Sequence, residues 1–203
     1  MFFRQIKQHG DNFSYVIADE ATGEAAVVDP SFNADAIIRL ATGQKLSVKY
    51  VIDTHGHVDH TAGNDEVRSK FDAKVVAHGL AKIRKDISVE DGDKLTLGAI
   101  DVNVIHTPGH TPDGICILVD KKLLTGDTLF VRECGRTDLP GGSAADLYHS
   151  LFDKLMKLDD DIEVYPGHDY GEHAYSTMGE EKRTNYVLEM RTLDEFIEFM
   201  REP

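Results

Sequence analysis

Thr54-His55-Gly56-His57-Val58-Asp59-His60 comes just after the apolar run Tyr50-Val51-Ile52 and holds three imidazoles and one carboxylate within six consecutive positions. Neutral imidazole nitrogen binds zinc, iron and copper, and a carboxylate adds charge and affinity for a hard divalent ion. A strand that ends abruptly in a loop can aim alternate side chains at one point beyond the sheet edge. The stretch therefore predicts a metal site at a strand end, and the alternative is a histidine-rich surface turn.

Three later loops favour the metal site. Each follows an expected strand, and each places glycine or proline beside a candidate ligand: His110, Asp127 and His168. Alone, His110 or His168 would more often be structural. Together with the 54–60 stretch they make seven ligands, which are too many for one tetrahedral ion and suit two ions that share a carboxylate. Two such ions roughly 3.5–4 Å apart can hold one hydroxide between them.

The rest of the chain alternates short apolar runs with helical patterns, which predicts an α/β fold of stacked sheets covered by helices. We expect an antiparallel meander from the first three strands, because tight turns separate them. The expected strands are 2–8, 13–18, 25–28, 48–52, 73–77, 94–97, 100–105, 114–119, 122–124 and 162–165, and the expected helices are 33–40, 64–70, 80–85, 143–158 and 192–200.

Composition narrows the classes of function. At 203 residues, with 41% hydrophobic and 29% charged residues, the chain fits one large globular domain, 1–203. A formal charge of −14 argues against nucleic acid as a partner. The N-terminus lacks the apolar region of a signal peptide, and no stretch is long enough to span a bilayer, so no membrane partner is expected. Cys116 and Cys134 give no disulfide framework, which favours a reducing cytoplasm.

The pattern His55-x-His57-x-Asp59-His60, followed by His110, Asp127 and His168, resembles the metallo-β-lactamase superfamily. The resemblance implies an αββα sandwich, in which two mixed sheets pack face to face with helices outside and the site lies along one edge. It also implies the ligand sets: His55, His57 and His110 for one ion, Asp59, His60 and His168 for the other, and Asp127 as the bridge. True β-lactamases commonly have cysteine or arginine where this chain has Asp127 or His60, so antibiotic hydrolysis is not expected.

Two families within the superfamily are similar to this chain. Residues 107–112 and 126–130 look like glyoxalase II, the hydroxyacylglutathione hydrolase, in which the residues matching Arg136 and Tyr170 grip glutathione. Residues 134–138 and 168–170 look like the persulfide dioxygenases, in which the residues matching His55, His110 and Asp127 hold one Fe(II). Glyoxalase II carries a further helical domain, whereas only 35 residues follow His168 here, and residues 176–185 resemble those of short, single-domain hydrolases.

The expected function is therefore hydrolysis of a small-molecule thioester, of glutathione or a related thiol, by a metal-bound hydroxide that Asp59 orients. The cofactors would be two divalent ions, zinc or iron or manganese. One alternative is a persulfide dioxygenase with a single iron. Another is a non-hydrolytic metal-binding redox module, which is disfavoured because the diiron relatives usually have glutamate in place of His57 and an attached flavin domain.

Several residues keep two interpretations. Arg136 either clamps a substrate carboxylate or pairs with Asp138, and Tyr170 either grips the thiol or packs its ring. Threonines beside the ligands could hydrogen-bond them: Thr54, Thr107, Thr111 and Thr128. Five histidines fall outside the pattern and are expected to be surface or core residues: His9, His78, His106, His149 and His173.

Overall fold

The computed structural model describes residues 1–8 and 10–201, so His9 lies outside the described residues. Two six-stranded sheets dominate the fold, with a two-stranded ribbon, β11 (Leu129–Phe130) and β12 (Glu133–Cys134), beside the second. The first sheet has the order β1-β2-β3-β4-β5-β6, and the second has the order β14-β13-β10-β9-β8-β7. In the described part of the chain, no helix has the length and apolar character that crossing a bilayer requires.

The first sheet begins with the expected antiparallel meander and continues with parallel strands. Its strands are β1 (Phe2–Lys7), β2 (Phe13–Ala18), β3 (Glu24–Val28), β4 (Ser47–Ile52), β5 (Lys74–His78) and β6 (Ile87–Val89). Val28 pairs with Ile52, and Ile52 pairs with Val76, so the carboxyl ends of these parallel strands are aligned. The loop after β4, which carries the 54–60 stretch, therefore leaves at this edge.

The second sheet is antiparallel except where β10 and β13 pair in parallel. Its strands are β7 (Lys94–Leu97), β8 (Ile100–His106), β9 (Ile115–Val119), β10 (Lys122–Gly126), β13 (Glu163–Pro166) and β14 (Ser176–Thr177). Gly126 pairs with Pro166, which means that the residues after both strands, Asp127 and the Gly167-His168 step, emerge side by side.

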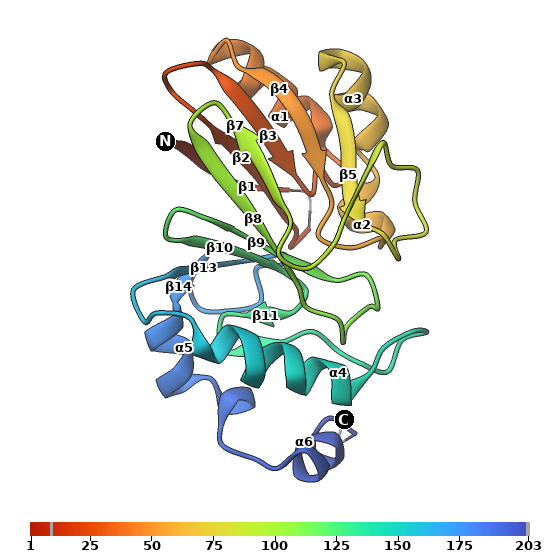
Figure 1. The fold of residues 1–203 in the computed structure, drawn as a ribbon, viewed down its shortest axis with the longest axis vertical. Helices are drawn as coiled ribbons and strands as arrows, with labels where there is room; N and C mark the ends of the chain where they lie inside the picture. The colour runs from red at the N-terminus through yellow and green to blue at the C-terminus, as the bar shows by residue number, and fades with distance from the viewer. Residues whose placement is uncertain (9, 202–203) are drawn as a thin grey trace.

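Helices cover the outer faces of both sheets. The helices are α1 (Ala34–Gly43), α2 (Val58–Thr61), α3 (Asn64–Phe71), α4 (Ala144–Tyr148), α5 (Met178–Thr184) and α6 (Leu193–Phe199), with short 3-10 turns at Leu155–Lys157 and Tyr186–Leu188. In Figure 1 α1 and α3 lie at one end of the molecule and α4, α5 and α6 at the other. Three apolar clusters separate the layers: one between the sheets, one under α1 and α3, and one under α4 and α6. The predicted αββα sandwich is confirmed.

Two of the expected helices differ from the structure. The helix expected at 80–85 is wrong, because this segment is an irregular connection between β5 and β6. Its ends are tied to the sheet, since the backbone N–H of Gly79 donates to Val89 and that of Asp86 donates to Val75. The helix expected at 143–158 begins as predicted with Ser143 accepting from Asp146, but after α4 it widens into a π-helical stretch, His149–Lys154.

Candidate metal centre

All seven predicted ligands meet at one edge of the sandwich, although they come from both sheets. His55, His57, Asp59 and His60 follow β4 of the first sheet, whereas His110, Asp127 and His168 follow β8, β10 and β13 of the second. Three sets of potential ligand atoms each lie within 4.8 Å of one another: His55, His57 and His110; His55, His60 and Asp127; and Asp59, His60 and His168. We call His55, His57 and His110 the first donor group, and Asp59, His60 and His168 the second donor group.

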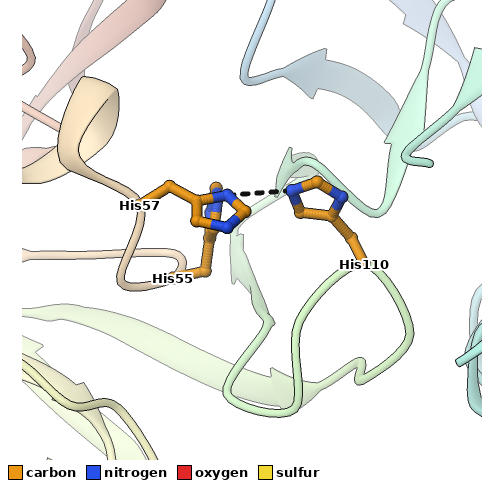
Figure 2. A group of neighbouring side chains, drawn as sticks. All are labelled: His55, His57 and His110. Carbon is orange, nitrogen blue, oxygen red and sulfur yellow. Dashed lines mark hydrogen bonds between the residues drawn. The ribbon is translucent and has the colours of Figure 1, made fainter. Parts of the chain in front are cut away.

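The rings of the first donor group point their nitrogens at a common centre, as Figure 2 shows. Nδ1 of His57 lies 2.9 Å from Nε2 of His55 and 3.1 Å from Nε2 of His110. Nδ1 of His110 donates to the backbone oxygen of Arg136 at 2.8 Å, so its Nε2 carries a lone pair. One proton on His57 could satisfy only one of its two neighbours, which leaves a nitrogen lone pair for a cation.

The second donor group has the spacing of a tetrahedral site. Nε2 of His60 and Nε2 of His168 are 3.2 Å apart, and Oδ2 of Asp59 lies 3.4 Å from each. Four ligands at the usual zinc–nitrogen distance would be separated by about 3.3 Å along each edge of the tetrahedron. The spacing of these three donors thus suits a divalent cation.

Asp127 lies between the two donor groups. Its Oδ1 is 3.4 Å from Nε2 of His60, and its Oδ2 is 3.3 Å from Nε2 of His168 and 3.6 Å from Nε2 of His110. Oδ1 is buried and has no hydrogen-bond partner among residues 1–8 and 10–201, which is costly for a carboxylate oxygen unless a cation binds it. Gly167 makes room for this arrangement, because a Cβ there would lie 2.4 Å from Asp127 Oδ1.

A buried aspartate behind the site, Asp29, supports both donor groups and was not expected from the sequence. Its carboxylate accepts from Nδ1 of His60 at 2.9 Å and from the hydroxyl of Thr54 at 2.6 Å. The Thr54 oxygen is then free to accept from Nδ1 of His55, 3.2 Å away. These bonds hold both rings with Nε2 toward the cluster. The sequence signal is slight, since Asp29 directly follows the expected strand 25–28, where an aspartate before proline is typical of a strand end.

The turn before β2 supplies two more supports that the sequence did not reveal. Nδ1 of His168 lies 3.2 Å from Oδ1 of Asp11, and the side-chain amide of Asn12 donates to Oδ2 of Asp59 at 3.0 Å. Both residues lie between the expected strands 2–8 and 13–18, where the sequence predicts only a tight turn. Of the threonines expected around the ligands, Thr54 contacts His55, whereas Thr107 and Thr128 bond each other at 2.9 Å. The hydroxyl of Thr111 is buried and has no partner among the described residues.

The two donor groups differ in their protonation. Burial lowers the pKa of His55 well below its usual value, and burial together with the nearby His110 lowers that of His57. In the second donor group burial also lowers the pKa of His60 and His168, but the neighbouring carboxylates raise it by more. Asp127 and Asp29 raise the pKa of His60, and bonds to Asp127 and Asp59 raise that of His168 to about 10. Despite burial, His168 and His60 hold the pKa of Asp59 below its ordinary value.

Of the two residues expected to bind substrate, Tyr170 contacts a ligand through its ring, whereas Arg136 contacts His110 only through its backbone oxygen. The guanidinium of Arg136 makes two bonds to Asp138, at 2.6 and 2.5 Å, which is the second of its two expected interpretations. It lines a cavity of about 900 Å³. Tyr170 is 55% exposed, and its ring stacks on His168 with centroids 4.9 Å apart.

The remaining described histidines lie outside the cluster. His78 is buried and stacks on His106 with centroids 3.9 Å apart, whereas His149 and His173 are exposed. Both cysteines are buried free thiols.

Comparisons with known proteins agree with the ligand pattern. A sequence model described as the metallo-beta-lactamase superfamily matches residues 9–84 and 80–168. A hydroxyacylglutathione hydrolase of Anaeromyxobacter dehalogenans is 38% identical over 172 residues, which cover 84% of this chain and 66% of that protein. The human mitochondrial persulfide dioxygenase ETHE1 is 34% identical over 93% of this chain and 75% of its own length. The crystal structure of ETHE1 from Myxococcus xanthus superposes with a TM-score of 0.95 at 36% identity, covering 100% of this chain and 91% of that one.

Proposed function

Because the chain belongs to the metallo-beta-lactamase superfamily, we propose that it is a metal-dependent hydrolase that cleaves the thioester of a small thiol such as glutathione. The observation that carries this proposal is the pair of donor groups that share Asp127. A mononuclear enzyme needs one such group, whereas the second donor group here also has ligand spacings of 3.2 to 3.4 Å.

In this reaction the metal ligands, Asp59 and the two substrate-binding residues would have separate roles. Bound divalent ions would lower the pKa of a water molecule toward neutrality and polarise the thioester carbonyl. Asp59 would orient that water, since it is about one third exposed and Asn12 fixes one of its oxygens. The leaving group is a thiolate, which departs without a strong general acid. Arg136 and Tyr170 would hold the thiol, with Arg136 exchanging Asp138 for a substrate carboxylate.

A second candidate is a persulfide dioxygenase with one iron at His55, His110 and Asp127. Two histidines and a carboxylate form the ligand set of many non-haem Fe(II) oxygenases. The similarity to ETHE1 of Myxococcus xanthus extends over the whole chain, whereas the chain spans only about two thirds of the hydroxyacylglutathione hydrolase. Both candidates use a glutathione-derived substrate and the same edge of the sandwich.

One preparation of the protein tests both candidates. Metal content is counted, and then loss of S-lactoylglutathione and oxygen uptake with glutathione persulfide are followed in parallel. We expect thioester loss with about two ions per chain. Oxygen uptake with about one iron per chain and no thioester loss would replace the hydrolase by the dioxygenase. Inactivity in both assays would refute both substrates.

A further inference from the structure

A smaller cavity, of about 330 Å³, opens beside His57 and has no role so far. Its walls include Leu80, Lys82 and Pro112. The loop that carries Arg136 separates the two cavities, because residues 136–138 line the larger one and residues 140–141 line the smaller one. The small cavity reaches the cluster at the first donor group, because His57 is one of its lining residues.

The two ends of the cluster face different surroundings. Tyr170 stacks on His168 of the second donor group, so a thiol held by Tyr170 approaches from that end. A thioester whose sulfur lies there extends its acyl group toward the first donor group. His57 of that group lines the small cavity, which makes this cavity the place for the acyl group.

The lining of the small cavity combines apolar walls with one cation at the rim. Leu80 is 58% exposed, and together with Pro112 it offers an apolar wall to a short carbon chain. Lys82 is exposed and forms neither an ion pair nor a hydrogen bond within residues 1–8 and 10–201. Deeper in, Oδ2 of Asp113 is buried without a partner in the part of the chain that the structure describes, and it would lie 3.2 Å from a Cβ at Gly56. This carboxylate disfavours an anion at the floor and leaves the rim, near Lys82, as the favourable place for one.

We propose that this cavity is the acyl pocket of the enzyme and that Lys82 selects acyl groups that end in a carboxylate. The proposal rests on the proposed thioester substrate. Lys82 is a specificity residue in this assignment, since it contacts the far end of the acyl group rather than the reacting carbonyl.

Two thioethers that cannot be hydrolysed test the proposal without turnover. S-(3-carboxypropyl)glutathione carries the terminal carboxylate, and S-butylglutathione lacks it. Calorimetry of the metal-loaded protein should show about fivefold tighter binding of the carboxylated ligand, as expected for one ion pair at a rim. K82M should reduce this ratio to about one, and K82R should retain most of it. The matched control is R84M, which removes a neighbouring exposed cation outside the cavity and should leave the ratio unchanged.

Equal affinity for the two thioethers, binding of neither, or an undiminished ratio in K82M would overturn the acyl pocket. Hydrolysis of S-lactoylglutathione is measured separately on the same preparation. Its absence would refute the thioesterase while the binding ratio still reports on Lys82.

Discussion

The two donor groups differ in composition and in charge, because the first holds three histidines and the second holds two histidines and an aspartate. In the first donor group, burial keeps His55 and His57 neutral, so their lone pairs are ready for a cation at neutral pH. In the second donor group, His60 and His168 retain protons, because Asp59, Asp127 and Asp29 surround them with negative charge. A cation must displace those protons. The number of ions bound therefore depends on whether a cation displaces the protons of the second donor group. The choice between hydrolase and dioxygenase depends on the same step.

The largest expected effect comes from the residue that the donor groups share. D127A removes the bridge, and we expect turnover to fall about a thousandfold or more, because both ions lose a ligand. Metal analysis and S-lactoylglutathione turnover measure this loss. Near-normal turnover in D127A would place the reaction elsewhere in the molecule.

Removing one ligand from each donor group separates them. H168A should lower the metal content from about two ions to about one and reduce thioester hydrolysis about a hundredfold. H110A, the matched variant, should weaken metal binding at the first donor group. If H168A keeps full activity, the second donor group is dispensable, and a mononuclear site remains.

D29N tests the support that the donor groups have in common. The carboxylate of Asp29 bonds His60 directly and His55 through Thr54. Without it, we expect metal affinity at both donor groups to fall about tenfold or more. Competition with a metal chelator gives the affinities. Loss confined to one donor group would mean that Asp29 supports only that group.

In metal-free protein the two donor groups should respond to pH in opposite directions. The pKa of His168 is raised to about 10 from 6.5, so its stabilising effect is complete below pH 6.5 and is lost as the pH rises toward 10. The pKa of His57 is lowered, so the unfolded chain takes up protons below pH 6.5 that folded His57 does not, and stability falls there. Denaturant unfolding across this range measures both limbs. H168Q should reduce the alkaline limb, to which His60 also contributes, and leave the acid limb as it is; an alkaline limb of unchanged size would contradict the assignment.

The smallest effect serves as a remote control. T192A removes the capping box of α6, in which Thr192 and Glu195 bond each other's backbone, and should destabilise the protein by about 1 kcal/mol. Metal content should not change. A change in metal content would show that the cluster depends on general stability, and the group-specific variants would then need correction for it.

Short-range patterns predicted the strands and the loops that carry the candidate ligands, whereas the αββα arrangement and the assignment of the seven residues to two ions were implied by the resemblance to the superfamily. Apolar runs marked the strands, and glycine or proline beside each candidate marked the loop. The prediction failed at residues 80–85, which have helical apolar spacing but whose flanking residues, Gly79 and Asp86, bond to β6 and β5. Such bonds join positions that are distant in sequence.

The supports of the ligands were missed for a similar reason. Asp11, Asn12 and Asp29 stand in turns, where aspartate and asparagine are common without any functional role. Only their distance to His168, Asp59 and His60 in space distinguishes them. The ion pair of Arg136 was one of two expectations, and the sequence could not choose between a partner two residues away and a substrate.

The origin of the ligands in two sheets has a mechanical consequence. Each donor group combines side chains that follow β4 of the first sheet with one that follows β8 or β13 of the second. A bound cation would act as a cross-link between the halves of the sandwich, resisting their sliding past each other. Amide exchange at the aligned ends of β4 and β10 should therefore slow on metal loading, while exchange in the peripheral β14 changes least.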